Sequence, residues 1–151
     1  MNDGVTFPRL LAMALRASID DLHDELHNRG YDLRPAQGFA LVAVGTEGTT
    51  ASRLADVLGI TKQGTAKLVD GLVEQGYLVR EAHGDDGRAR LLVLTERGTA
   101  LLRESVRIQR RIEAEWTATV GGDDMRALRR ALETALARRY PDGPPPIRPT
   151  W

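Results

Sequence analysis

The polar start of one short segment holds the residues best suited to chemistry with an external partner. Residues 59–72 read GITKQGTAKLVDGL, and the second half of this run carries apolar positions at helical spacing. The first half carries two cations, an amide and a glycine: Lys62, Gln63, Gly64 and Lys67. Ammonium groups can bind phosphate or guanine, and a glutamine side chain can pair with adenine through two hydrogen bonds. The segment is predicted to be a helix anchored by its C-terminal half, with its N-terminal half exposed.

Three further residues of this segment can be explained either by helix structure or by contact with a partner. Thr61 is placed to cap the helix, its side-chain oxygen accepting from a free amide of the first turn, and such free amides also favour a phosphate. Gly64 lowers helix stability by about 0.5–1 kcal/mol relative to alanine. It either lets the backbone come close to a partner or is a turn glycine at a frayed helix end. Thr65 lies four residues before Val69, on the same face of the helix. It is therefore predicted to be half buried and not to contact bases.

Two helices joined by a short turn must position this segment. A helix is predicted over about 51–58, with Thr50 as its N-cap. Gly59 ends this helix, because glycine can take the left-handed conformation that a helix stop often needs. Thr61 then caps the second helix, which extends to about Gln75. The pair is a helix-turn-helix pattern, whose second helix can enter the major groove of DNA with its N-terminal residues at the base edges.

A β-hairpin is predicted directly after the second helix. Two β-prone runs, 77–82 and 88–94, flank a loop rich in glycine and aspartate. Asp86, Arg88 and Arg90 lie in or beside this loop, and an arginine at a wing tip can insert into the minor groove. Asp86 could hold Arg88 in position by a charge-assisted bond. The alternative is a solvated hairpin whose surface ion pairs contribute little; after a helix-turn-helix, the DNA interpretation is favoured.

Long helices are predicted on both sides of this winged helix. Apolar residues recur every three or four positions over about 8–28, 96–119 and 124–139, and a shorter helix is expected over about 35–45. Asp123 is the expected N-cap of the last helix. The apolar stripes exceed what a small winged-helix core needs, so two-fold pairing of the chain is predicted to bury them. Pairing would set two DNA half-sites near one helical turn apart, ~34 Å; the alternative is a larger monomeric core.

The predicted fold class is mainly α with a small β wing. The winged helix-turn-helix core spans about 35–98, and the N- and C-terminal dimerisation helices span about 8–28 and 96–139. Together they form a single domain over 1–140. Residues 141–151 contain five prolines and are predicted to be a flexible tail.

Composition narrows the functional class. The 151 residues favour one domain, and 42% of them are hydrophobic, which is enough for a core. No apolar run approaches the ~20 residues of a membrane span, and no signal peptide is evident. The absence of cysteine removes disulfides, thiol catalysis and thiol redox sensing. A cytoplasmic protein without a membrane partner is expected; its zero net charge counts mildly against a nucleic-acid binder, although a local basic patch can still bind phosphate.

A second candidate site is the pair His23 and His27. These histidines are four residues apart on the first helix, with Asp20, Asp24 and Glu25 nearby, so both imidazoles fall on one face where a metal could bind. Two histidines and scattered acids fall short of a closed site, and no metal is expected. The polar lining of an effector pocket is favoured over a metal site, and a solvated helix face is favoured over both.

Enzyme motifs are missing from the sequence. There is no glycine-rich phosphate loop and no G-x-S-x-G, and the serines lack a neighbouring histidine signature. The chain is therefore predicted not to be an enzyme, with no catalytic residue and no cofactor. A winged helix used for protein contact is a third class, and weak salt dependence of its binding would distinguish it from DNA binding.

Residues 50–98 resemble the MarR family of bacterial transcriptional regulators. The most specific parts are DGR at 86–88, similar to the D-x-R wing of the family, and LTERG at 94–98, similar to its L-T-x-x-G junction between strand and helix. The run LVDGLVEQGYLVR at 68–80 also looks like the family. With the helices on both sides, the resemblance covers about residues 8–139.

The resemblance implies a homodimer on a pseudo-palindromic operator in double-stranded DNA, often a repressor that an unidentified small molecule releases. A protein-interaction module, or a metal-responsive regulator using His23 and His27, is the alternative. Departures from the family are found at Gly64, Thr65 and Gly71, where members often carry Ser, Thr, Val or Arg, and in a slightly short wing loop. By position, the resemblance implies that Lys62, Gln63, Gly64 and Lys67 contact the major groove. It also implies that Arg88, oriented by Asp86, contacts the minor groove.

Overall fold

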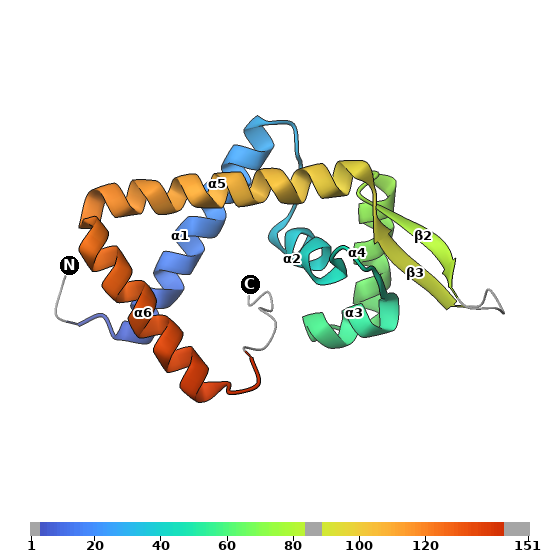
Figure 1. Ribbon diagram of the computed structural model, residues 1–151. Coiled ribbons are helices and arrows are strands. Elements are labelled where there is room, and N and C mark those ends of the chain that lie inside the picture. Colours follow the sequence, from blue (N-terminus) through green and yellow to red (C-terminus); the bar gives the residue numbers. More distant parts are fainter. Residues whose placement is uncertain (1–3, 84–88, 144–151) are drawn as a thin grey trace.

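The computed structural model describes residues 4–83 and 89–143 of the chain. These residues form six α-helices and a small antiparallel sheet (Figure 1), which confirms the predicted mainly helical fold with a β wing. The elements in chain order are α1 (Phe7–Asn28), α2 (Pro35–Val44), β1 (Thr49–Thr50), α3 (Ala51–Leu58), α4 (Lys62–Glu74), β2 (Leu78–His83), β3 (Ala89–Leu94), α5 (Glu96–Val120) and α6 (Gly122–Arg139).

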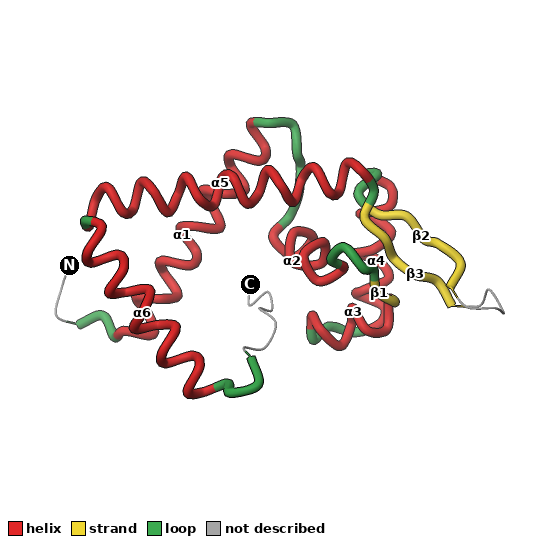
Figure 2. The backbone as a smooth tube through the Cα atoms, viewed as in Figure 1, coloured by secondary structure: helices red, strands yellow, loops and turns green. Residues whose placement is uncertain are grey.

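The long helix α5 connects the two ends of the molecule. Helices α2, α3 and α4 gather with the hairpin at one end, whereas α1 and α6 lie toward the other (Figures 1 and 2). Helix α1 packs against α5, and α6 turns back from its end. The strands β2 and β3 project away from the helices as a ribbon. None of the described helices is long and apolar enough to cross a lipid bilayer.

Local signals in the sequence account for the helix-turn-helix. The side-chain oxygen of Thr50 accepts a hydrogen bond from the backbone N–H of Arg53 at 3.3 Å, which caps α3. Gly59 takes a left-handed conformation with φ of 67° at the end of α3. Thr61 then caps α4 by accepting from the N–H of Gly64 at 3.0 Å. These observations confirm the predicted caps and the predicted stop.

The core lies where α2, α3 and α4 meet the start of α5 and the sheet. Leucines from each of these elements are almost fully buried there, and Tyr77, between α4 and β2, is only 1% exposed. The buried residues of this central cluster include Leu41, Leu54, Leu72, Leu78, Leu92, Leu101 and Ile108. Burial of this apolar surface supplies the main driving force that fixes α4 on the domain.

One strand was not predicted from the sequence, and one predicted helix cap is wrong. Thr49 and Thr50 form β1, paired with Leu92 and Leu91 of β3, and give a sheet in the order β1-β3-β2. A two-residue strand is too short to show an alternating pattern. Asp123 is not the N-cap of α6, which begins at Gly122.

The positive φ of Gly121, 95°, explains the start of α6. This one glycine turns the chain between α5 and α6, and Gly122 already belongs to the helix. Asp123 lies in the first helical turn, where its carboxylate bonds Arg126. An acid in this position is favoured by the partial positive charge of the helix N-terminus. Residues 141–143 form a turn, and the rest of the predicted tail lies outside the described residues.

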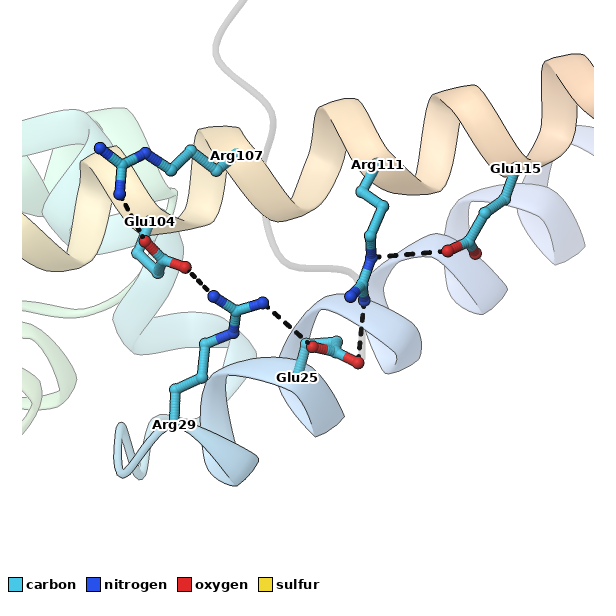
Figure 3. A network of polar contacts seen from close by, with 6 residues as sticks. All are labelled: Glu25, Arg29, Glu104, Arg107, Arg111 and Glu115. Carbon is cyan, nitrogen blue, oxygen red and sulfur yellow. Dashed lines mark hydrogen bonds and ion pairs between the residues drawn. The ribbon is translucent and has the colours of Figure 1, made fainter.

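A chain of ion pairs ties α1 to α5 (Figure 3). Arg29, just after α1, contacts Glu25 of α1 and Glu104 of α5. Glu25 also accepts from Arg111 of α5 at 2.8 Å, and the hydrogen bond and positive charge of Arg111 lower the pKa of the Glu25 carboxyl. Arg107 and Glu115 extend the network along α5. Two arginines of α5, Arg107 and Arg111, are therefore engaged in ion pairs within the chain.

Candidate nucleic-acid interface

Helix α4 has one buried and one exposed side along its length. Leu68, Val69 and Leu72 are at most 8% exposed and fix the helix against α2 and α3. Lys62 and Lys67 are exposed on the other side. The arrangement matches the predicted anchoring by the C-terminal half. It presents two ammonium groups at one end of a rigid helix.

The other predicted contact residues of α4 are placed by the cap. Gln63 and Gly64 are exposed, and Thr61 holds the first turn through its side-chain oxygen. A Cβ at residue 64 would stand 3.2 Å from that oxygen, so the glycine leaves room for the cap. Gly64 therefore lies in a capped helical turn, not at a frayed end. Thr65, expected to be half buried, is fully buried, and its hydroxyl donates to the carbonyl of Thr61 at 3.0 Å.

The exposed side of α4 includes two residues that were not predicted as contacts. Ala66 and Asp70 are exposed one turn apart, in line with Lys62. A methyl group in this position can contact the methyl of thymine. Asp70 is bonded by Arg80 of β2, which ties the end of this surface to the wing. Helical spacing alone would have found Ala66, because residue 66 follows Lys62 by four positions.

A further cation lies beside α4 although it is far away in the sequence. Arg34, the residue before α2, lines one open hollow together with Lys67 and Gly64. The side chain of Arg34 is exposed. No local pattern predicts this neighbour, because it depends on how α2 packs against α4. The hollow adds a positive charge to the basic surface at the start of α4.

The wing is described only in part. Arg90 is exposed on β3, where it is paired with Ala82 of β2. Asp86 and Arg88 lie outside the described residues, so their predicted roles stay predictions. The described strands β2 and β3 themselves extend away from the helical body (Figure 1).

The structure does not bring His23 and His27 into one site. His23 lines a cavity of about 200 Å3 between α1, α2 and α5, whereas His27 is exposed and does not line this cavity. Nδ1 of His23 lies 2.9 Å from the carbonyl oxygen of Leu33. A carbonyl can only accept, so Nδ1 carries the hydrogen, and in the neutral ring Nε2 is an acceptor. Among the described residues, no group of three or more His, Asp or Glu side chains could hold a metal ion.

The cavity wall is mainly apolar. Its polar side chains come from His23, Ser105 and Gln109, and no lysine or arginine is found among its described lining residues. The edge of the His23 ring formed by Cε1 and Nε2 faces Gly38, where a Cβ would stand 4.0 Å away. The apolar lining residues are Leu15, Ile19, Leu22, Leu26, Leu33, Pro35, Gly38, Phe39, Val42, Leu101 and Leu102.

The helix-turn-helix, the β ribbon and the long flanking helices define a winged helix-turn-helix protein. Residues 31–89 match the MarR family model. This match confirms the resemblance to the family that is seen in the sequence.

Known proteins similar to this chain include a regulator related by sequence and two proteins of similar fold. The HTH-type transcriptional regulator PetP of Rhodobacter capsulatus is 35% identical over 98 residues, which are 62% of this chain and 58% of PetP. The reduced form of MarR from E. coli has a TM-score of 0.78 at 24% identity, over 89% of this chain and 99% of that one. CouR, a repressor solved on a 23-mer DNA duplex, has a TM-score of 0.68 at 26% identity, over 89% and 97%. The match thus spans little more than half the length of PetP.

Proposed function

We propose that this protein is a transcriptional regulator that binds an operator in double-stranded DNA as a homodimer. The observation that carries the proposal is the start of α4, where Lys62, Gln63 and Lys67 are exposed while Leu68 and Leu72 hold the helix on the core. A helix of this kind fits the major groove with its N-terminal residues at the bases. The likeness to CouR, solved on DNA, supports the same use of the fold. This role would place the protein in the cytoplasm with the chromosome.

A second copy of the chain is the partner that the long helices fit. Phe7 and Met13 of α1 and Leu136 of α6 are about half exposed (58%, 50% and 48%), and within the described chain none of the residues of α6 is buried. Apolar residues of α5 and α6 line a hollow of about 380 Å3 with Ser18 of α1. Exposed apolar surface of this extent marks an interaction site. Two-fold pairing would cover it and fix the distance between two copies of α4.

Repression released by a small molecule is the mode of action we infer, with the cavity at His23 as the effector site. The acceptor Nε2 of His23 would suit a hydroxyl or N–H donor on the ligand. Since no cation is found among the described lining residues, the cavity favours a neutral and mainly apolar ligand. A volume of about 200 Å3 suits a molecule built around a single ring. His27 has no part in this site.

A gel-shift titration of the purified protein tests the DNA proposal. The protein is titrated against a library of random duplexes, and bound sequences are selected and tested again at two salt concentrations. A selected pseudo-palindrome bound far more tightly than its scrambled version, with affinity falling as salt rises, is the expected result. Selection of no sequence, together with binding that is insensitive to salt, would contradict it and favour a protein-contact role.

A further inference from the structure

Three successive residues between α1 and α2 are bonded to different parts of the protein. The carbonyl oxygen of Leu33 accepts from His23 of α1 at 2.9 Å. The carbonyl oxygen of Asp32 accepts from Nε2 of Gln75, the C-cap residue that follows α4, at 3.1 Å. The N–H of Arg34 donates to Oε1 of Gln37 at 2.9 Å. This connection, residues 32–34, therefore lies between the cavity on one side and the end of α4 on the other.

Gln37 completes a second link between the connection and α4. Its Nε2 donates to Oε1 of Gln75 at 2.9 Å, while its Oε1 accepts from Arg34. Gln37 is only 4% exposed, whereas its partners Arg34 and Gln75 are exposed, so both bonds are partly buried. Its amide also lies against α4, because a Cβ at Gly71 would stand 3.5 Å from its Nε2. A buried amide with fixed partners on both sides allows little independent movement of the two helices.

We propose that His23, the connection 32–34, Gln37 and Gln75 form a path that couples occupancy of the cavity to the position of α4. The path begins at a cavity-lining ring and ends at the C-cap of the helix whose other end carries Lys62 and Lys67. This inference rests on the proposed function, since it assigns a route for regulation to the same two sites. A ligand that draws the His23 ring toward itself weakens the bond to Leu33, which releases Asp32 and Gln75.

The geometry of α4 makes the end at Gln75 an effective point of control. Residues Lys62–Glu74 form one continuous helix, so a tilt at its C-terminal end displaces its N-terminal end as well. The last turn is held by three backbone bonds, from the N–H groups of Gln75 to Gly71, Gly76 to Val73 and Tyr77 to Leu72. These three amides report directly on whether the end of α4 is fixed.

A double-mutant cycle followed by amide hydrogen exchange tests the path without DNA or ligand. His23→Phe keeps a ring in the cavity but loses the bond to Leu33, and Gln75→Ala loses the bonds to Gln37 and Asp32. Each change is expected to speed exchange at the amides of residues 75–77 several-fold. The double variant is expected to exchange no faster than the faster single variant, because both changes break one path.

Ser105→Ala is the matched control for the cavity. Ser105 lines the cavity but donates only within α5, to the carbonyl of Leu101 at 3.0 Å, so its loss should leave the amides of residues 75–77 unchanged. The amide of Ile112 serves as the reference for global opening. If a variant speeds exchange equally at Ile112, the same cycle is read from the 1H–15N chemical shifts of residues 75–77, which need no unfolding.

The outcomes separate this inference from the proposed function. Unchanged amides at 75–77 in His23→Phe, or effects that multiply in the double variant, would overturn the path even if the protein binds an operator. A coupled cycle in a protein that selects no DNA would keep the path and overturn the proposed function instead. A response to Ser105→Ala equal to that of His23→Phe would also overturn the path, since it would show a general effect of altering the cavity.

Discussion

Gly98 lies so close to the carbonyl of Tyr77 that a Cβ at residue 98 would stand 2.3 Å from that oxygen. The same oxygen accepts from the N–H of Thr95 at 3.0 Å, and the guanidinium of Arg97 lies 4.9 Å from the centre of the Tyr77 ring. The start of β2 and the first turn of α5 are thus in backbone contact. This contact sets the direction in which α5 leaves the sheet.

Gly98→Ala is therefore expected to destabilise the protein by about 2–4 kcal/mol, in the upper range of single substitutions, because backbone must move to admit the methyl group. The midpoint of urea unfolding measures the loss. Gly71→Ala is the matched control, since a Cβ there meets its nearest neighbour at 3.5 Å. That change should be neutral or stabilise by up to about 1 kcal/mol, as alanine does in helices. Equal stability of the two variants would refute the steric argument.

Lys67→Ala is expected to weaken operator binding and to reduce the salt dependence of binding. Loss of one phosphate contact should lower the slope of log affinity against log salt by about 1. The slope is measured by titrations over several salt concentrations. Arg126→Ala removes a cation on α6, far along the chain from α4, and should leave the slope unaltered. If the slope for Lys67→Ala equals the wild-type slope, Lys67 does not contact a phosphate.

Arg88→Ala is expected to weaken operator binding while leaving the dimer intact. The expectation rests on the D-x-R motif, since residue 88 lies outside the described residues, and a lost minor-groove arginine should cost affinity mainly at A·T-rich flanks. Gel shifts measure the affinity and sedimentation measures the mass. Arg90→Ala, on β3, shows how far along the hairpin the contact extends. If Arg88→Ala binds the operator with wild-type affinity, Arg88 of the wing does not contact the minor groove.

Leu136→Glu is expected to yield a monomer. A carboxylate in the surface that we assign to the second copy would have to be desolvated on pairing, which is costly. Sedimentation equilibrium measures the mass, and circular dichroism checks that the helices persist. Val79→Glu, which places a carboxylate at a similarly exposed apolar position on β2, is the matched control and should remain a dimer. A monomeric wild-type protein would contradict the proposed homodimer.

The ion pairs between α1 and α5 predict a pH dependence. Arg111 lowers the pKa of Glu25 in the folded protein, so the stabilising effect is present above the ordinary carboxyl pKa and is lost as pH falls through the folded value. Glu25→Gln should lower the melting temperature at about pH 7 and lower it by less at about pH 3. Glu133→Gln, whose pair with Arg129 lies within α6, should have the smaller effect at neutral pH. An equal drop for Glu25→Gln at both pH values would contradict the assignment.

The sequence by itself determined the features that act over a few residues. The caps at Thr50 and Thr61 and the stop at Gly59 each involve partners at most four positions away, so the local pattern was enough to place them. The exposed start of α4 could be predicted for the same reason. One helix presents its residues at a fixed spacing, whatever surrounds it.

Only the tertiary structure decided which distant segments meet. Arg34 lies beside Lys67, and Gln37 bonds Gln75, because α2 packs across α4, a relationship that neither local sequence carries. His23 and His27 share a helix, yet only His23 reaches the cavity, because α2 and α5 cover one part of α1. The physical reason is that capping and helix periodicity are short-range effects, whereas the neighbours of a side chain depend on how whole apolar faces are buried against one another.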